Sequence, residues 1–146
     1  MSSGAAGTIT QVFEVRNKSQ AACVINGYFG VGAVDATGHV FVDATRATEI
    51  PAGTASPPHD VVLPAATAAL DPSKLAGSQS GSGATPGHGY FYVSYEHNCN
   101  GGASTGADRW QLIPPDQTQA IILASQERTF CAPVVSPVDD ALLKAH

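Results

Sequence analysis

The stretch Tyr90–His97, with the sequence YFYVSYEH, decides the fold because its side chains alternate between two faces over its whole length. Phe91 and Tyr95 fall on one face of an extended chain, whereas Tyr90 and Tyr92 fall on the other. A period of two combined with aromatic and β-branched residues is typical of a β-strand. We therefore predict a strand here, with the Phe91 face turned toward the core.

Further strands are predicted on both sides of this stretch. Their spans are Thr8–Asn17, Ala22–Ile25, Val31–Val34, His39–Asp43, Asp60–Leu63, Arg109–Ile113, Gln119–Ala124 and Thr129–Ser136. We expect 8–17 to be half-buried, 22–25 to pair back on it, and the nearly all-apolar 119–124 to be buried on both sides. The turn Asp35-Ala36-Thr37-Gly38 has the residues of a type I turn followed by a left-handed glycine, which predicts a hairpin.

About eight short strands separated by turn residues predict one all-β domain over residues 1–146. We expect an antiparallel immunoglobulin-like β-sandwich with Greek-key connections. The Gly- and Ser-rich segment 77–89 is predicted to be a flexible loop. The ends 1–7 and 139–146 are expected to be frayed, with a short terminal helix over Asp139–Lys144.

Composition narrows the class of protein. Only 13% of the 146 residues are charged, and the net charge is −5. Seven basic residues spread along the chain cannot form a stripe that follows phosphates, so we expect no nucleic-acid partner. We also expect no transmembrane segment, because no apolar run reaches about eighteen residues, and no signal peptide is recognisable.

The three cysteines, Cys23, Cys99 and Cys131, are far apart and contain no CxxC pair, which argues against a structural zinc site. An odd number indicates one disulfide with a leftover thiol, or a fourth cysteine lost upstream. Low Lys and Glu content favours an oxidising compartment, and three buried thiols in a cytosolic protein are the alternative.

Catalytic and metal motifs are weak. Ser82 lies in a Gly-Ser-Gly loop without the strand-to-helix elbow of a serine hydrolase, and Cys131 lies in an apolar strand where a thiol is unreactive. The histidines at 39, 59, 88 and 97 form no HxH or HxxxH pair, and Asp139-Asp140 is expected to be a solvated part of the tail. We therefore predict no catalytic residue, no metal and no cofactor.

One surface feature could bind a ligand. Tyr90 and Tyr92 stand together on the outer face of their strand, and Trp110 could lie near them. Exposed aromatic rings stack on sugars and anchor protein partners. The alternative is that neighbouring strands or the long loop cover these rings.

Several short motifs resemble a known family. Gly4-Ala5-Ala6-Gly7 opens the first strand, Cys23 precedes Gly27-Tyr28, a D-x-x-G turn spans 35–38, and Cys99 and Cys131 follow. Together they resemble a secreted domain of unknown function that is frequent in actinobacterial exported proteins and lipoproteins. The resemblance covers most of 4–138.

The chain departs from that family at several places. Phe29 stands where the family usually has Pro, Pro64-Ala65 replaces a Pro-Gly turn, and 77–89 resembles an extension. The family usually has a further cysteine just before its GAAG stretch, whereas here Met1-Ser2-Ser3 precedes it. We expect a trimmed mature domain whose export signal and first cysteine are missing, which would explain the odd number of cysteines.

The resemblance implies an extracellular or cell-envelope location and supplies no catalytic residues. It also implies a Cys99–Cys131 disulfide, which would close a loop of about thirty residues and contribute roughly 3 to 4 kcal/mol. Cys23 would then be a leftover thiol, buried as a small apolar residue.

The function expected from these observations is a non-enzymatic binding or structural module of the cell envelope, with an envelope protein or a glycan as partner. One alternative is a glycan- or protein-binding module that uses Tyr90, Tyr92 and Trp110. The other is an enzyme or metal site assembled from His97, His39 and Glu96.

Overall fold

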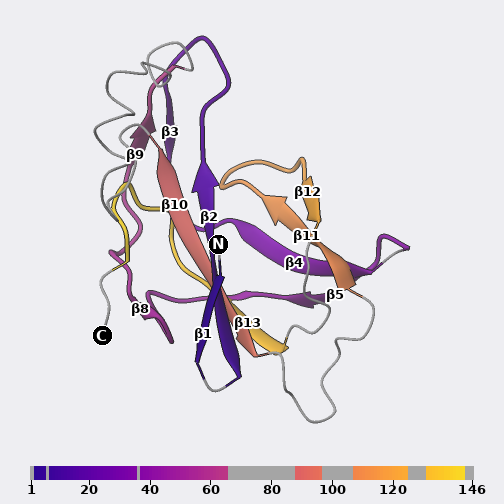
Figure 1. Cartoon of the computed structure of the whole chain (residues 1–146). Helices are drawn as coiled ribbons and strands as arrows, with labels where there is room; N and C mark the ends of the chain where they lie inside the picture. Colours follow the sequence, from indigo (N-terminus) through magenta and orange to yellow (C-terminus); the bar gives the residue numbers. More distant parts are fainter. Residues whose placement is uncertain are drawn as a thin grey trace.

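The computed structural model describes residues 2–5, 7–35, 37–65, 88–96, 107–124 and 131–143 of the chain. Across these ranges the protein contains strands and no helix, which confirms the predicted all-β class (Figure 1). Accordingly, no helix in them could span a membrane. Ser82, His97 and Cys99 lie outside the described residues, as does the predicted loop up to residue 87.

The larger sheet has β10 at its centre. The strand order is β1 (Ser2–Ala5), β2 (Thr8–Val15), β10 (Gly89–Glu96), β13 (Cys131–Val135) and β6 (Thr45–Arg46). All neighbours are antiparallel except β13 and β6, which are parallel. Phe13 of β2 stands directly opposite Phe91 of β10, so the two predicted inward faces coincide.

A second sheet of four antiparallel strands crosses the first (Figure 1). Its order is β12 (Ile121–Ala124), β11 (Ala107–Ile113), β4 (Gly30–Asp35) and β5 (Val40–Asp43). The described residues also contain two small pairs, β3 (Cys23–Ile25) with β9 (Val61–Leu63) and β7 (Glu49–Ile50) with β8 (Gly53–Thr54). The structure is thus consistent with a β-sandwich, and its immunoglobulin-like topology stays a prediction.

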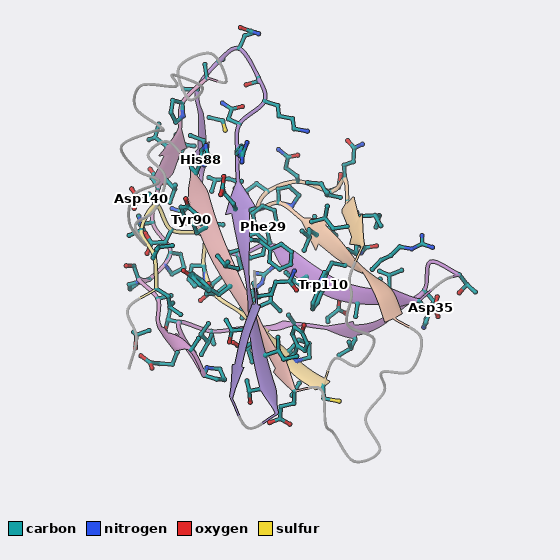
Figure 2. All side chains as sticks on the ribbon, viewed as in Figure 1. Phe29, Asp35, His88, Tyr90, Trp110 and Asp140 are labelled. Carbon is teal, nitrogen blue, oxygen red and sulfur yellow. The ribbon has the colours of Figure 1, made fainter. Side chains whose placement is uncertain are left out.

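Aromatic side chains fill the space between the two sheets. The Phe91 ring stacks on Phe13 with 5.0 Å between centroids and on Phe29 with 4.3 Å. Trp110 of β11 meets the edges of Phe13 and Tyr95 at 6.0 and 5.5 Å, and Figure 2 shows Phe29 and Trp110 in the interior. Rings at such separations add to the stabilisation given by burial of their apolar area.

The outer face of β10 is buried as well. Ser94 and its cross-strand neighbour Thr10 are both buried, and their hydroxyl oxygens lie 2.7 Å apart in a hydrogen bond. The same bond satisfies two hydroxyl groups that would otherwise be costly to remove from water. The expectation that 8–17 is half-buried is therefore wrong at Thr10.

Pairing and chain ends differ from the sequence-based expectations. Residues 23–25 pair with β9, not with β2. Residues 2–5 are not frayed but form β1 against β2. The expected terminal helix is also wrong, because Asp139 makes an antiparallel bridge to Tyr90 and residues 140–143 are not helical. A long-range backbone partner decides the conformation of 23–25 and of Asp139, whereas β1 pairs with the strand that directly follows it.

The predicted hairpin is confirmed, since β4 and β5 are joined by the turn that begins at Asp35. The Asp35 carboxylate accepts hydrogen bonds from the Thr37 hydroxyl at 2.6 Å, the Thr37 N–H at 2.9 Å and the His39 N–H at 3.0 Å. Gly38 has a φ of +89°, which glycine adopts without steric cost.

We expect Phe91→Ala to lower the free energy of unfolding by about 3–5 kcal/mol, because it removes the middle ring of the aromatic stack. Urea unfolding followed by the fluorescence of the single tryptophan, Trp110, measures the loss. Val24→Ala is the control, since Val24 is 58% exposed and its truncation should stay within about 0.5 kcal/mol. Equal effects of the two substitutions would contradict the packing described above.

The Asp35 turn should respond to acid. The Thr37 hydroxyl, followed by the His39 N–H, stabilises the carboxylate and holds the Asp35 pKa below its ordinary value of 3.8. A lowered folded-state pKa gives stability that is present above the unfolded pKa and is lost as pH falls through the folded value. NMR titration of the Asp35 carboxyl carbon should therefore give a midpoint below that in urea-unfolded protein. Identical midpoints would show that the turn does not stabilise the charge.

Candidate functional site

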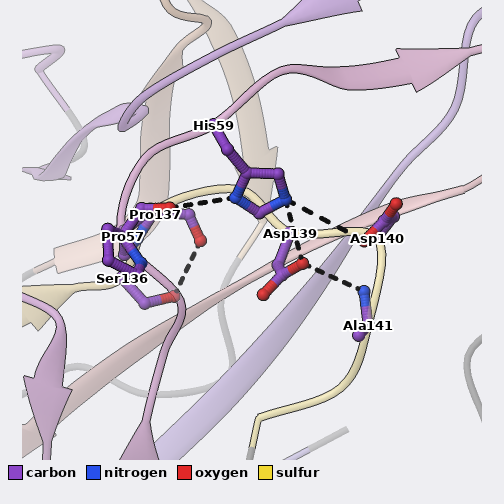
Figure 3. A network of polar contacts seen from close by, with 7 residues as sticks. All are labelled: Pro57, His59, Ser136, Pro137, Asp139, Asp140 and Ala141. Atoms are coloured by element: carbon purple, nitrogen blue, oxygen red, sulfur yellow. Dashed lines mark hydrogen bonds and ion pairs between the residues drawn. The ribbon is translucent and has the colours of Figure 1, made fainter.

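His59, Asp139 and Asp140 form the one group of potential metal-ligating side chains in the ranges that the structure describes (Figure 3). Their ligand atoms all lie within 4.8 Å of one another. His59 Nε2 is 3.4 Å from Asp139 Oδ1 and 4.0 Å from Asp140 Oδ1. One imidazole and two carboxylates therefore converge on a single small volume.

The backbone holds these groups in place. His59 follows two prolines in the segment between β8 and β9, and its Nδ1 lies 2.9 Å from the Pro57 carbonyl oxygen. Asp139 is fixed against β10, because the Tyr90 N–H donates to the Asp139 carbonyl at 2.7 Å and the Asp139 N–H donates back at 2.8 Å. Two segments that are far apart in the sequence thus meet at the end of the larger sheet.

Asp139 is ionised at neutral pH. Burial is the largest single influence on its carboxyl and raises the pKa, but hydrogen bonds with the Ser56 side chain, with Asp140 and with the Ala141 N–H together outweigh it. The net result is a pKa below the ordinary value. The Ala141 N–H lies 3.3 Å from Asp139 Oδ1. The site therefore carries negative charge where it faces His59.

The sequence motifs do not predict this group. His59 belongs to no short metal-binding motif, and Asp139-Asp140 is expected to be a solvated part of the tail. The structure contradicts the expectation of a solvated tail at Asp139, which is only partly exposed and whose backbone is paired with β10, whereas Asp140 is exposed as expected. No local sequence signal connects the two segments, since the bridge between Asp139 and Tyr90 creates their proximity.

The predicted aromatic surface is wrong at two of its three positions. Tyr90 is 6% exposed and Trp110 is fully buried (Figure 2). Tyr92 is half-buried, and its hydroxyl accepts the Leu143 N–H at 3.2 Å. The tyrosines are covered because residues 136–143 run along β10, where the Ser136 N–H donates to the Tyr92 carbonyl at 2.9 Å. Trp110 is buried because its ring points between the sheets, where it contacts Phe13.

The alternative site of His97, His39 and Glu96 receives no support from the geometry. His97 lies outside the described residues. His39 is exposed in the turn before β5 of the second sheet, whereas Glu96 is exposed at the end of β10 in the larger sheet. His88, expected in the flexible loop, is instead buried at the start of β10 with Nδ1 2.6 Å from Glu14 Oε1. The end of the predicted loop, at 88 and 89, therefore belongs to the core.

Cysteine positions agree only in part with expectation. Cys23 is a free cysteine, but it is exposed and not buried. Its strand, β3, pairs only with β9 in the described structure, and Val24 beside it is also exposed. Cys131 is buried in β13. Its expected partner, Cys99, lies outside the described residues, so the pairing stays a prediction.

The edge strand β12 exposes three consecutive apolar side chains. Ile121, Ile122 and Leu123 are 47%, 49% and 40% exposed. The prediction that this strand is buried on both sides is therefore wrong. Its place at the end of the second sheet explains the difference, because in the described structure β11 is its only neighbour.

Comparisons of this chain with protein-family models, with curated proteins and with solved structures gave no match.

Proposed function

We propose that this protein is an exported, cell-envelope-associated module without catalytic activity that binds another protein through β12. The observation that carries the proposal is the exposed apolar run Ile121–Leu123 on an edge strand. Export is supported by the low content of charged residues and by the resemblance to secreted domains. The absence of a serine-hydrolase elbow in the sequence favours binding over hydrolysis.

The inner face of β12 supports the binding role. Leu123 stands opposite Trp110 and Ile121 stands opposite Leu112, so each pair shares one face of the sheet. Trp110 and Leu112 are buried, whereas their partners on β12 are exposed. The core-facing side of the second sheet therefore extends past the part that the first sheet covers, and it leaves apolar area for a partner.

Within the residues that the structure describes, the edge of β12 also lacks the usual protection. Natural edge strands avoid pairing with other chains by means of charged residues, prolines or bulges. Residues 117–124 contain no charge and no proline. An extended apolar segment of a partner protein could add as a further strand, with main-chain hydrogen bonds for affinity and the exposed side chains for specificity.

The glycan alternative is less well supported than protein binding. Sugar stacking requires an exposed ring face, and Tyr90 and Trp110 have none to offer. The half-buried Tyr92 is the remaining candidate.

We also propose the Cys99–Cys131 disulfide as part of an exported protein. Two observations support it. Cys131 is disulfide-bonded, whereas Cys23 is a free thiol. Mass spectrometry of unreduced, alkylated protein should show one alkylated cysteine, Cys23, and a linked pair of peptides that contain Cys99 and Cys131. Three alkylated cysteines would remove both the bridge and the main argument for an oxidising compartment.

Binding through β12 can be tested with a photo-crosslinking amino acid at Ile122 in cells that produce the protein. We expect one discrete adduct with another envelope protein, and direct binding of that purified protein should be lost in the variant Ile121→Lys, whose charge opposes strand addition. Val62, 59% exposed on β9, is the matched control position and should give no adduct. Equal adducts at both positions, no adduct at Ile122, or an adduct between two copies of this chain would overturn the proposal.

A further inference from the structure

We propose that His59, Asp139 and Asp140 bind a divalent first-row transition metal ion of the Zn²⁺ type, with water in the remaining coordination positions. This inference is independent of binding through β12, because it concerns the C-terminal segment beside the larger sheet. It rests on the lone pairs that face one another, on the distances and on the way the ligands are held.

The first argument concerns the tautomer of His59. A carbonyl oxygen only accepts hydrogen bonds, so His59 Nδ1, 2.9 Å from the Pro57 oxygen, carries the hydrogen. In the neutral imidazole, Nε2 then presents a lone pair toward Asp139 and Asp140 (Figure 3). With His59 neutral, its Nε2 lone pair and one oxygen from each of the two carboxyl groups lie around the same small volume. A cation at its centre could accept electron pairs from all three.

The second argument is the spacing. Ligand atoms about 2.1 Å from a tetrahedral zinc ion lie about 3.4 Å from each other. The distance between His59 Nε2 and Asp139 Oδ1 is 3.4 Å, which fits without movement. Asp140 Oδ1 is farther away at 4.0 Å, but its side chain is 66% exposed and free to rotate toward the ion.

The third argument is the support behind the ligands. Metal-binding histidines usually donate their other ring N–H to a carbonyl or carboxylate, which fixes the tautomer and orientation. Pro57 provides that carbonyl for His59. Asp139 is held by a hydrogen bond from the Ala141 N–H to its carboxylate and by its backbone bridge to Tyr90. These contacts would remain in place while the carboxylate and the imidazole bind the ion.

The donor set selects the class of metal. Ca²⁺ and Mg²⁺ prefer all-oxygen sites, and soft ions such as Cu⁺ prefer sulfur. One imidazole nitrogen and two carboxylate oxygens suit Zn²⁺ and its first-row neighbours. A bound ion would connect the segment before β9 to the C-terminal segment, and it would stabilise the folded state by an amount that rises with the logarithm of its concentration above the dissociation constant.

Isothermal titration of the untagged, chelator-treated full chain with Zn²⁺ tests the proposal. We expect one ion per chain, and His59→Gln and Asp140→Asn should each weaken binding by at least about tenfold. His39→Gln and Asp43→Asn are matched controls, because they remove an exposed histidine and an exposed aspartate outside the site. They should leave binding unchanged.

A second measurement does not depend on the fold of a variant. NMR of the histidine ring nitrogens in the unchanged protein should show that Zn²⁺ shifts His59 Nε2 selectively, whereas His39 is unaffected. No measurable binding, binding that the site variants do not weaken, or equal losses in the control variants would overturn the proposal. None of them would affect binding through β12, so the two proposals fail separately.

Discussion

Phe91 lies between Phe13 and Phe29, and this stack of three rings is the contact on which the sandwich depends. It joins the larger sheet to the chain that enters β4, and Trp110 extends it toward β11. Aromatic rings bury a large apolar area and have few rotatable bonds, so a small number of them can stabilise the core of this domain. β10, the central strand of the larger sheet, carries the middle ring of this stack.

A central strand of this kind must also be covered on its outer face. Ser94 meets Thr10 there, and the segment 136–143 runs alongside Tyr90 and Tyr92. That coverage buries Tyr90 and leaves Tyr92 half-buried, so β10 does not present a pair of exposed aromatic rings. It also brings Asp139 to His59, because the bridge between Asp139 and Tyr90 positions both the backbone and the carboxylate. The candidate metal site is therefore a consequence of how β10 is buried.

The second sheet is covered less completely. β11 buries Trp110 and Leu112 against the core, but β12 lies beyond the aromatic stack, and its side chains on the same face are exposed. Apolar composition alone would place Ile121–Leu123 inside the protein. Because β12 is an edge strand, these side chains are exposed instead. They form the surface through which we propose that the protein binds its partner.

Strand existence could be predicted from the sequence because alternation and turn chemistry are local. The central strand at Tyr90, the strand from Thr8 and the hairpin at Asp35 all appear where the residues indicate them. Only the tertiary structure decided that β3 pairs with β9, that Trp110 is internal and that His59 meets Asp139. These facts depend on the order of strands within the sheets, which is set by contacts between residues distant in the sequence and leaves no local pattern.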